Sequence, residues 1–303
     1  MRVLITGAGG FIGRNLITAL LGEADTEIVA LSRSGLDIPG VRVYPCDILN
    51  RGAVESVFRE NQFDCVIHLA AITAHSEIVD NRMKTFETNL QGTINLLNSF
   101  NTYCRGGQFI YASTGKVYGK TNEMPISENA LVDPTNILGK TKRITEEVIE
   151  FYAQPENRYL ILRIFNIYGE GQRSHFVLPT ILAQLEQEHI QLGSLKDFRD
   201  YLYVDDLIDA FKACIASPAK FSNVDHVNIG SGEPACVADI LREIEKLIGR
   251  KLKVTVDQSK FRHDETPVEF CNHSKLTAQT GWTPRYSLAD GVEKTLRANG
   301  VIS

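Results

Sequence analysis

The feature that most constrains the fold is a short apolar run that leads directly into a glycine-rich turn near the N-terminus. Residues 2–6 read RVLIT, and Gly7, Gly10 and Gly13 follow within GAGGFIG. Apolar and β-branched residues in a short run predict a buried strand, and the apolar residues after Gly10 recur with helical spacing. A strand that turns through glycines into a helix is the repeating unit of layered α/β folds.

Short apolar runs and amphipathic stretches alternate through the first half of the chain. Strands are expected within residues 2–7, 26–32, 41–47, 65–71, 108–113 and 159–166, and helices within 11–21, 51–60, 85–104 and 140–154. Strands that read as continuous apolar runs are typical of a parallel sheet covered on both faces. The sequence therefore predicts an α/β chain with a Rossmann-like, doubly wound parallel sheet.

The pattern changes after Tyr168, where proline and glycine punctuate the chain. A helix within 238–249 and a strand within 251–257 indicate a smaller C-terminal α/β lobe. We expect a first domain over residues 1–168, to which segments from about 195–230 return. The lobe over residues 169–303 is expected mainly to bind substrate.

Charge and cysteine content exclude several classes of function. The formal net charge is -5 and the pI is about 5.9, without a block of Lys or Arg, which argues against partners such as nucleic acid or an anionic membrane. No apolar run reaches the roughly 20 residues of a membrane span, and no signal peptide precedes the first strand, so a cytoplasmic protein is expected. The six cysteines are scattered, and neither a disulfide framework nor a metal site is expected.

The glycine-rich turn predicts a dinucleotide-binding site, because it follows a strand and opens a helix. Gly7 would make the tight turn, Gly10 would let backbone amides approach the pyrophosphate, and Gly13 would let helix and strand pack closely. Phe11 and Ile12 belong to the first helical turn, whose N-terminus favours negative charge.

The end of the next strand bears on the choice of cofactor. Ser32 and Arg33 stand where an acidic residue would bind the ribose hydroxyls of NAD(H). A hydroxyl followed by a guanidinium suits a ribose 2′-phosphate, so NADP(H) is the preferred cofactor, and NAD(H) is possible. A solvated surface role for Arg33 is the alternative.

The GxxGxxG spacing resembles the extended short-chain dehydrogenase/reductase superfamily, in its branch of nucleotide-sugar epimerases, dehydratases and reductases. The resemblance runs along essentially the whole chain. It implies adenine contacts from Asp47 and Ile48, and it implies that Asn89 braces the active-site helix. It further places the strand end His68, Leu69, Ala70 and Ala71 under the nicotinamide riboside.

The segment YASTGKVYG is similar to the catalytic segment of that branch, and it places Thr114 at the reacting oxygen of the sugar. Dehydratases of the branch carry Asp-Glu after this hydroxyl residue, whereas this chain carries Gly115 and Lys116. Dehydration is therefore disfavoured. The branch also has a Tyr and a Lys four residues apart on one helix, but here the tyrosine position holds Leu138, and Lys142 remains to bind the nicotinamide ribose.

Leu138 can neither donate nor accept a proton, which weakens alcohol oxidation more than ketone reduction. The preferred function is therefore reduction of a 4-keto nucleotide-diphosphate sugar, with Thr114 or a water as proton donor. Tyr118, Tyr168 and His75 are further candidate donors, although packing or rim positions are the simpler interpretation of each. A nucleotide-sugar 4-epimerase is the alternative, and a catalytically silent sensor of NADP or sugar nucleotides is a further one.

Other motifs predict how the substrate and a second subunit would bind. The segments RIFNIYG, RDYLYVDD and KFRHDE resemble those in which Asn166, Arg199 and Arg262 grip the diphosphate, with Asp205 and Asp206 orienting Arg199. By the same resemblance, helices near 90–104 and 140–154 would form a homodimer interface. The apolar positions Ile144, Val148 and Phe151 fit that interface or packing within the chain.

Overall fold

A seven-stranded, entirely parallel sheet forms the centre of the computed structural model, which describes residues 1–261 and 266–303. Its strand order is β10-β6-β5-β4-β1-β2-β3. The strands are β1 (Arg2–Thr6), β2 (Glu27–Ser32), β3 (Arg42–Pro45), β4 (Cys65–His68), β5 (Gln108–Thr114), β6 (Arg158–Ile164) and β10 (Val224–Ile229). The order reverses direction at β1 and β4, as in dinucleotide-binding folds.

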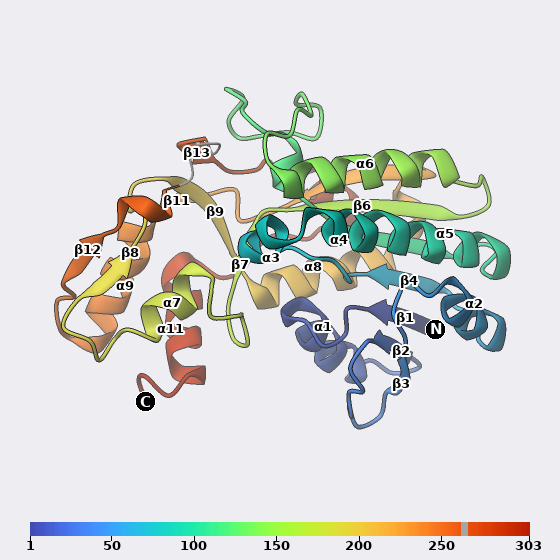
Figure 1. The fold of residues 1–303 in the computed structure, drawn as a ribbon, viewed down its shortest axis with the longest axis horizontal. Helices are drawn as coiled ribbons and strands as arrows, with labels where there is room; N and C mark the ends of the chain where they lie inside the picture. The colour runs from blue at the N-terminus through green and yellow to red at the C-terminus, as the bar shows by residue number, and fades with distance from the viewer. Residues whose placement is uncertain (262–265) are drawn as a thin grey trace.

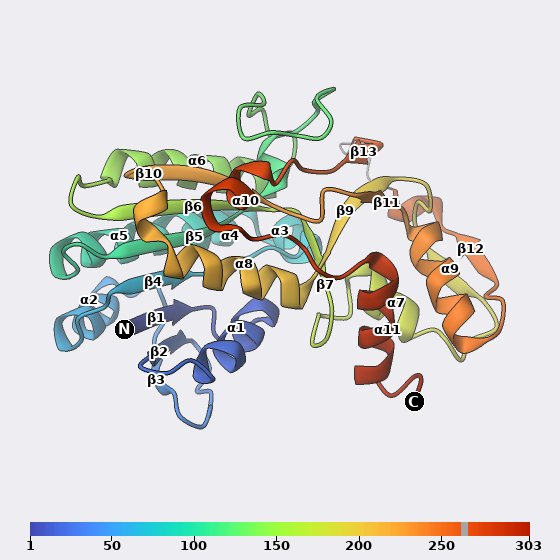
Figure 2. The same cartoon turned by 180° about the vertical axis from the view of Figure 1, so that it is seen from behind.

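Helices cover both faces of this sheet (Figures 1 and 2). One face packs on α1 (Phe11–Leu21) and α8 (Val204–Ala216). The other packs on α2 (Arg51–Glu60), α5 (Gly92–Tyr103) and α6 (Ile137–Tyr152). The strand interiors are buried almost completely, which explains why they read as continuous apolar runs. The predicted α/β class with a Rossmann-like sheet is confirmed.

One expected helix is divided into three elements. In place of a single helix over 85–104, the chain forms α4 (Arg82–Phe86), a π-helical turn (Glu87–Gln91) and α5. The short α3 (His75–Asp80) precedes them. Single π turns inside helices occur frequently at functional sites, and this one holds Asn89.

The C-terminal part of the chain forms a second, smaller α/β region beside the carboxyl ends of the parallel strands (Figure 1). The strand β9 (Phe198–Tyr203) lies at its centre and pairs with β7 (Asn166–Tyr168), β11 (Pro234–Ala235) and β13 (Val268–Glu269). A separate pair joins β8 (Ile190–Leu192) to β12 (Val254–Val256). The helices of the region are α7 (Val177–Leu182), α9 (Val237–Ile248) and α11 (Leu288–Ala298), and α10 (Ser274–Thr280) packs on β10.

The chain crosses between the two regions more than once. The strand β7 belongs to the smaller region, whereas α8 and β10 return to the large sheet. These placements support, as a proposal, a boundary near residue 168 with a returning segment inside 195–230. Within the described ranges, no helix has both the length and the apolar character needed to cross a membrane.

Candidate functional site

The glycine-rich turn after β1 is held against the end of β4. Gly7 has φ of +72°, and a Cβ placed on it would lie 2.7 Å from the amide nitrogen of Ala70. A Cβ on Gly13 would lie 2.4 Å from the carbonyl oxygen of Gly7. The helix α1 begins at Phe11, and its N-cap residue, Gly10, has no side chain that could cap the first amides. The first amides of α1 are therefore open to an anion, and the turn fits the pyrophosphate of a dinucleotide.

The segment after β2 folds over this turn. Ser32 Oγ donates a hydrogen bond to the carbonyl oxygen of Ser34 at 2.7 Å, and Arg33 is exposed. A Cβ on Gly9 would lie 3.1 Å from Leu36 Cδ1, so Leu36 covers the glycines. Sequence reasoning missed Leu36, because an isolated leucine in a loop carries no motif. Because Arg33 is exposed, its side chain can point either toward a ribose 2′-phosphate or into solvent.

The two residues expected at the adenine differ in exposure. The Asp47 carboxylate accepts a hydrogen bond from the amide of Leu49 at 3.0 Å, and this side chain is exposed. Ile48 is buried, and its side chain fills the space beside Gly92, where an added Cβ would lie 2.4 Å away. The exposed Asp47 can therefore reach a ligand, whereas Ile48 packs against the start of α5 at Gly92.

Asn89 ties three segments of the site together. Its side-chain oxygen accepts from the amide of Ile72 at 2.8 Å, and its Nδ2 donates to the carbonyl of Ile72 at 3.1 Å. The same Nδ2 lies 3.5 Å from Thr141 Oγ1 on α6. These bonds fix the loop after Leu69, Ala70 and Ala71 relative to α6, so the geometry agrees with a bracing residue.

Lys142 lies on α6, at the carboxyl end of β5. Its ammonium donates to the carbonyl oxygen of Ala112 at 2.6 Å and stands 4.6 Å from the ring centre of Tyr111. Burial lowers the pKa of Lys142 to about 7, against the opposing effect of the Glu146 carboxylate. A lysine in this state exchanges a proton near neutral pH.

Leu138 is half-buried in the first turn of α6, one turn before Lys142. The helix starts there because the Asn136 side chain accepts a hydrogen bond from the amide of Gly139 at 2.8 Å. Nearby, Thr114 Oγ1 accepts from the amide of Lys116 at 3.2 Å and is partly exposed. The hydroxyl of Thr114 and the aliphatic side chain of Leu138 thus belong to adjoining segments.

Two of the further candidate donors are structural. The Tyr118 hydroxyl donates to Asn228 Oδ1 at 2.7 Å and accepts from Arg163 at 3.1 Å, and burial raises its pKa to about 12. The Tyr168 hydroxyl donates to the carbonyl of Leu288 at 3.3 Å, inside the smaller region. Both tyrosines therefore support packing rather than proton transfer. The side chain of His75 lies outside the described part of the chain.

A buried charged group behind β5 was missed from the sequence. Glu146 is fully buried, accepts a hydrogen bond from Ser113 Oγ and pairs with Arg163 at 2.9 Å. The spacing of Glu146, four residues after Lys142 on one helix, was the available signal. This group fixes the direction of β5 immediately before Thr114.

The predicted substrate contacts lie on two neighbouring strands of the smaller region. Asn166 begins β7 and is paired in register with Tyr201 on β9, where Arg199 is nearly buried. The Arg199 guanidinium donates to the carbonyl of Phe198 at 2.8 Å. Arg262 lies outside the described residues.

The predicted role of Asp205 and Asp206 requires correction. Asp206 is buried and accepts hydrogen bonds from the amides of Arg285 and Tyr286, each at 3.0 Å. Asp205 lies 3.6 Å from Lys294. These carboxylates are therefore engaged with the C-terminal segment, at Arg285, Tyr286 and Lys294, instead of orienting Arg199.

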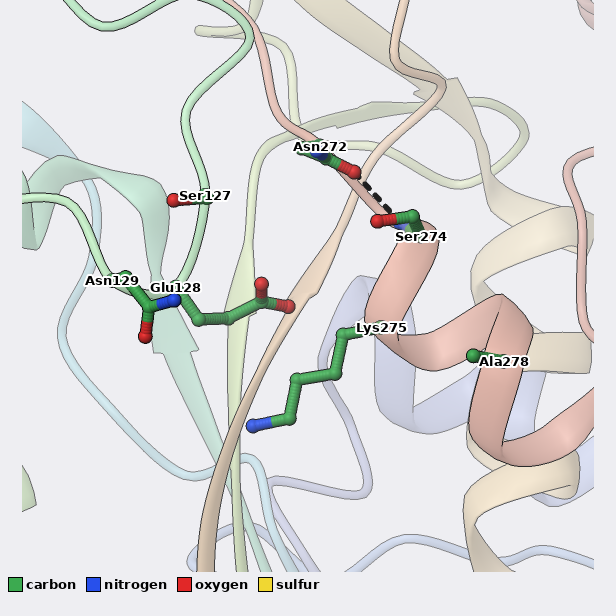
Figure 3. A pocket seen from close by; sticks show the side chains of 7 residues that line it. All are labelled: Ser127, Glu128, Asn129, Asn272, Ser274, Lys275 and Ala278. Carbon is green, nitrogen blue, oxygen red and sulfur yellow. Dashed lines mark hydrogen bonds between the residues drawn. The ribbon is translucent and has the colours of Figure 1, made fainter.

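A hollow of about 520 Å³ lies on the far side of β10 and does not coincide with this site (Figure 3). Its lining includes Glu128, whose carboxylate accepts from the amide of Asn228, and Lys275, which is paired with Asp225. Glu128 and Lys275 thus cover the open edge of β10, and both are already bound to residues of that strand. Within the described ranges, no group of three His, Cys, Asp or Glu side chains is placed to hold a metal ion.

Comparison with protein families matches residues 3–230 to the NAD dependent epimerase/dehydratase family. The chain belongs to this family. The match covers the glycine turn, Thr114, Lys142 and Arg199, and it ends within the loop after β10. The resemblance inferred from the motifs is therefore confirmed at the level of the family.

Curated relatives of this member are 4-epimerases and a reductase. A bifunctional UDP-glucose and UDP-xylose 4-epimerase of Arabidopsis thaliana is 26% identical, over 94% of this chain and 92% of its own length. The GDP-6-deoxy-D-mannose reductase of Pseudomonas aeruginosa is 28% identical, over 98% of this chain and 95% of its own.

Solved structures give the same picture of the fold. The UDP-glucose 4-epimerase of Thermotoga maritima with UDP-glucose superposes with a TM-score of 0.89, at 25% identity and 99% coverage of both chains. The UDP-glucuronic acid 4-epimerase of Bacillus cereus, in complex with UDP-glucuronic acid and NAD, has a TM-score of 0.88 at 26% identity, covering 99% of this chain and 100% of its own.

Proposed function

We propose that this protein is a nicotinamide-dependent oxidoreductase that acts on a nucleotide-diphosphate sugar, with 4-epimerisation as its first candidate reaction. The observation that carries the proposal is that the glycine turn, Lys142 and Thr114 all lie at the carboxyl ends of strands of one parallel sheet. Ligands of open α/β sheets bind at the carboxyl ends of the strands, where these groups lie. The 4-epimerases among the relatives favour this reaction over the reduction expected from the sequence.

The cofactor proposed is a nicotinamide dinucleotide; Ser32 and Arg33 favour NADP(H), and NAD(H) is the alternative. The Bacillus cereus neighbour holds NAD, which supports the dinucleotide but not the 2′-phosphate. Gly7, Gly10 and Gly13 would hold the pyrophosphate, and Lys142 would hold the nicotinamide ribose. When bound, the nicotinamide supplies and accepts hydride.

The substrate side of the proposal rests on β7 and β9. Asn166 and Arg199 would hold the diphosphate, and Thr114 would contact the reacting oxygen of the sugar. The nearly buried guanidinium of Arg199 suits a diphosphate, because a bidentate fork both neutralises and orients it. Relatives and neighbours named for UDP- and GDP-sugars support this substrate class.

A second candidate reaction is reduction of a 4-keto nucleotide sugar. Leu138 carries this candidate, because it removes the proton acceptor that alcohol oxidation requires, and 4-epimerisation begins with that oxidation. The reductase from Pseudomonas aeruginosa, similar over nearly the whole chain, supports it independently.

One experiment separates the two reactions. The purified protein is incubated with NAD and UDP-glucose, and the products are followed by ¹H NMR; in parallel, NADH or NADPH is mixed with a UDP-linked 4-keto hexose and absorbance is followed. Formation of the 4-epimer without net consumption of cofactor identifies the epimerase. Consumption of one reduced cofactor per keto sugar, without epimer formation, identifies the reductase. Inactivity in both arms, repeated with the GDP-linked sugars, would refute the proposed function.

A further inference from the structure

A nearly buried ion pair joins the segment after β5 to the smaller region. Lys116 Nζ lies 2.8 Å from Glu269 Oε2, and the two side chains are only 16% and 7% exposed. Lys116 lies in the 3-10 turn Gly115–Val117, and Glu269 lies on β13. Removing two charges from water costs about as much as their attraction returns, so such a pair is weak evidence of added stability. Its presence calls for a chemical explanation.

The ion pair connects the two places where the substrate is expected to bind. At one end, the amide of Lys116 donates to Thr114 Oγ1, the hydroxyl expected at the reacting oxygen. At the other end, Glu269 is paired in register with Arg199, the residue expected at the diphosphate. A sugar held between Thr114 and Arg199 would therefore lie between the two segments that the ion pair joins.

Lys116 also adjoins the helix turn that lacks an acid. A Cβ placed on Gly139 would lie 2.4 Å from the carbonyl oxygen of Lys116, so the first turn of α6 rests directly on this residue. Leu138 immediately precedes that contact. The backbone of Lys116 thus lies against the helix turn that holds Leu138.

We propose that the Lys116 ammonium is the proton donor in ketone reduction, and that Glu269 positions it. This inference rests on the proposed function, and the step is common to the keto-sugar reductase and to the second half of 4-epimerisation. A hydride from a reduced nicotinamide dinucleotide forms the new C–H bond at the carbonyl carbon, and the dinucleotide is thereby oxidised. One N–H bond of Lys116 breaks as its proton forms the O–H bond on the former carbonyl oxygen. Lys116 is left as a neutral amine, which regains a proton from water.

The test compares Lys116→Gln and Lys116→Arg with Lys120→Gln, a matched control at an exposed lysine four residues later. Single-turnover reduction of a UDP-linked 4-keto hexose by reduced nicotinamide dinucleotide is followed as a function of pH. Binding of UDP to each protein without cofactor is measured by calorimetry. Losing a general acid typically slows a reaction by about 10²–10⁴-fold, so both Lys116 variants are expected to be at least roughly 100-fold slower.

The Arg variant separates proton transfer from a structural role. Arginine preserves the charge and the pairing with Glu269 but does not release its proton in proteins. Unchanged UDP affinity with slow reduction by both variants supports the proposal. Reduction restored to within threefold by Lys116→Arg, or retained by Lys116→Gln, overturns it and leaves the proposed function standing. Absence of reduction by the wild type, with the UDP-linked and the GDP-linked keto sugar, overturns the proposed donor, and absence of epimerisation as well overturns the proposed function.

Discussion

At the scale of single residues, the structure keeps the glycine turn and the anchored Lys142, while Leu138 stands where the motif predicts a tyrosine. Gly7 and Gly13 leave no space for a side chain, and Lys142 is anchored at Ala112. These residues could be recognised from the sequence because each belongs to a motif with fixed spacing. The partners of Lys116 and Glu146 could not, because no local pattern records a contact between distant segments.

Restoring a tyrosine should favour oxidation. In Leu138→Tyr, the phenol would lie one turn from the Lys142 ammonium on the same helix face, which lowers the pKa of a phenol and makes it a base. We expect oxidation of a 4-hydroxy nucleotide sugar to rise by about tenfold or more, within the range of a general base. Initial rates with NAD measure this effect. The matched variant Leu138→Phe supplies the ring without the hydroxyl and should show no gain; an equal gain in both would contradict the prediction.

Lys142 should make the stability of the ligand-free protein depend on pH. Burial lowers its pKa to about 7, whereas the pKa of a lysine in an unfolded chain is about 10.4. Below pH 7 both states hold the proton, and the folded state bears the full cost of the buried charge. Between these two values the unfolded chain binds more protons, so the free energy of unfolding rises with pH.

Urea unfolding at several pH values from 7 to 10 tests this dependence. We expect Lys142→Met to reduce the slope of the unfolding free energy by up to about 1.4 kcal/mol per pH unit, the limit for one proton. Lys140→Met, at an exposed position on the same helix, is the control and should preserve the slope. Equal slopes in the wild type and in Lys142→Met would show that the lysine is not held neutral.

At the scale of elements, the sequence predicted most strands and helices because their apolar residues follow a regular period. The exceptions lie at α4, the π turn and α6. The single helix expected over 85–104 is interrupted where Asn89 bonds to the loop at Ile72. The helix α6 starts at Ile137, three residues earlier than expected, because Asn136 caps it. In both cases a side-chain hydrogen bond decided a boundary that periodicity leaves open.

The outer face of α6 bears on assembly. Phe151 is 86% exposed and Ile144 is 37% exposed, although both are large apolar residues. We propose that this face forms the homodimer interface expected from the sequence. Phe151→Glu would place a charge in that interface and should shift the protein toward monomer by at least about tenfold in dissociation constant, because buried unpaired charges are costly. Light scattering coupled to gel filtration measures the mass. Leu131→Glu, at another exposed apolar residue, should leave it unchanged, and a dimer unaffected by Phe151→Glu would exclude this face.

At the scale of the whole molecule, the residues of the candidate site come from two regions, the one built on the large parallel sheet and the smaller one around β9. The large region supplies the glycine turn after β1, Thr114 at the end of β5 and Lys142 on α6, while β7 and β9 supply Asn166 and Arg199. The returning α8 and β10 fix the two regions relative to each other, partly through Asp206 and Trp282. A substrate would therefore be held by both regions, and this arrangement suits a reaction that requires a sugar and a nicotinamide at a fixed distance.

The sequence by itself determined the alternation of strands and helices, the glycine turn and the family, and it placed a leucine at position 138. Each depends on residues close together in the chain, where period and spacing are directly readable. Only the tertiary structure decided that Lys116 meets Glu269, 153 residues away, and that Tyr118 is engaged with Arg163 and Asn228. Such pairings follow from strand order and register, which bring distant segments together and leave no trace in local spacing. Leu138 therefore raises the question of the proton donor from the sequence, whereas the contacts of Lys116, the donor that we propose, are visible only in the fold.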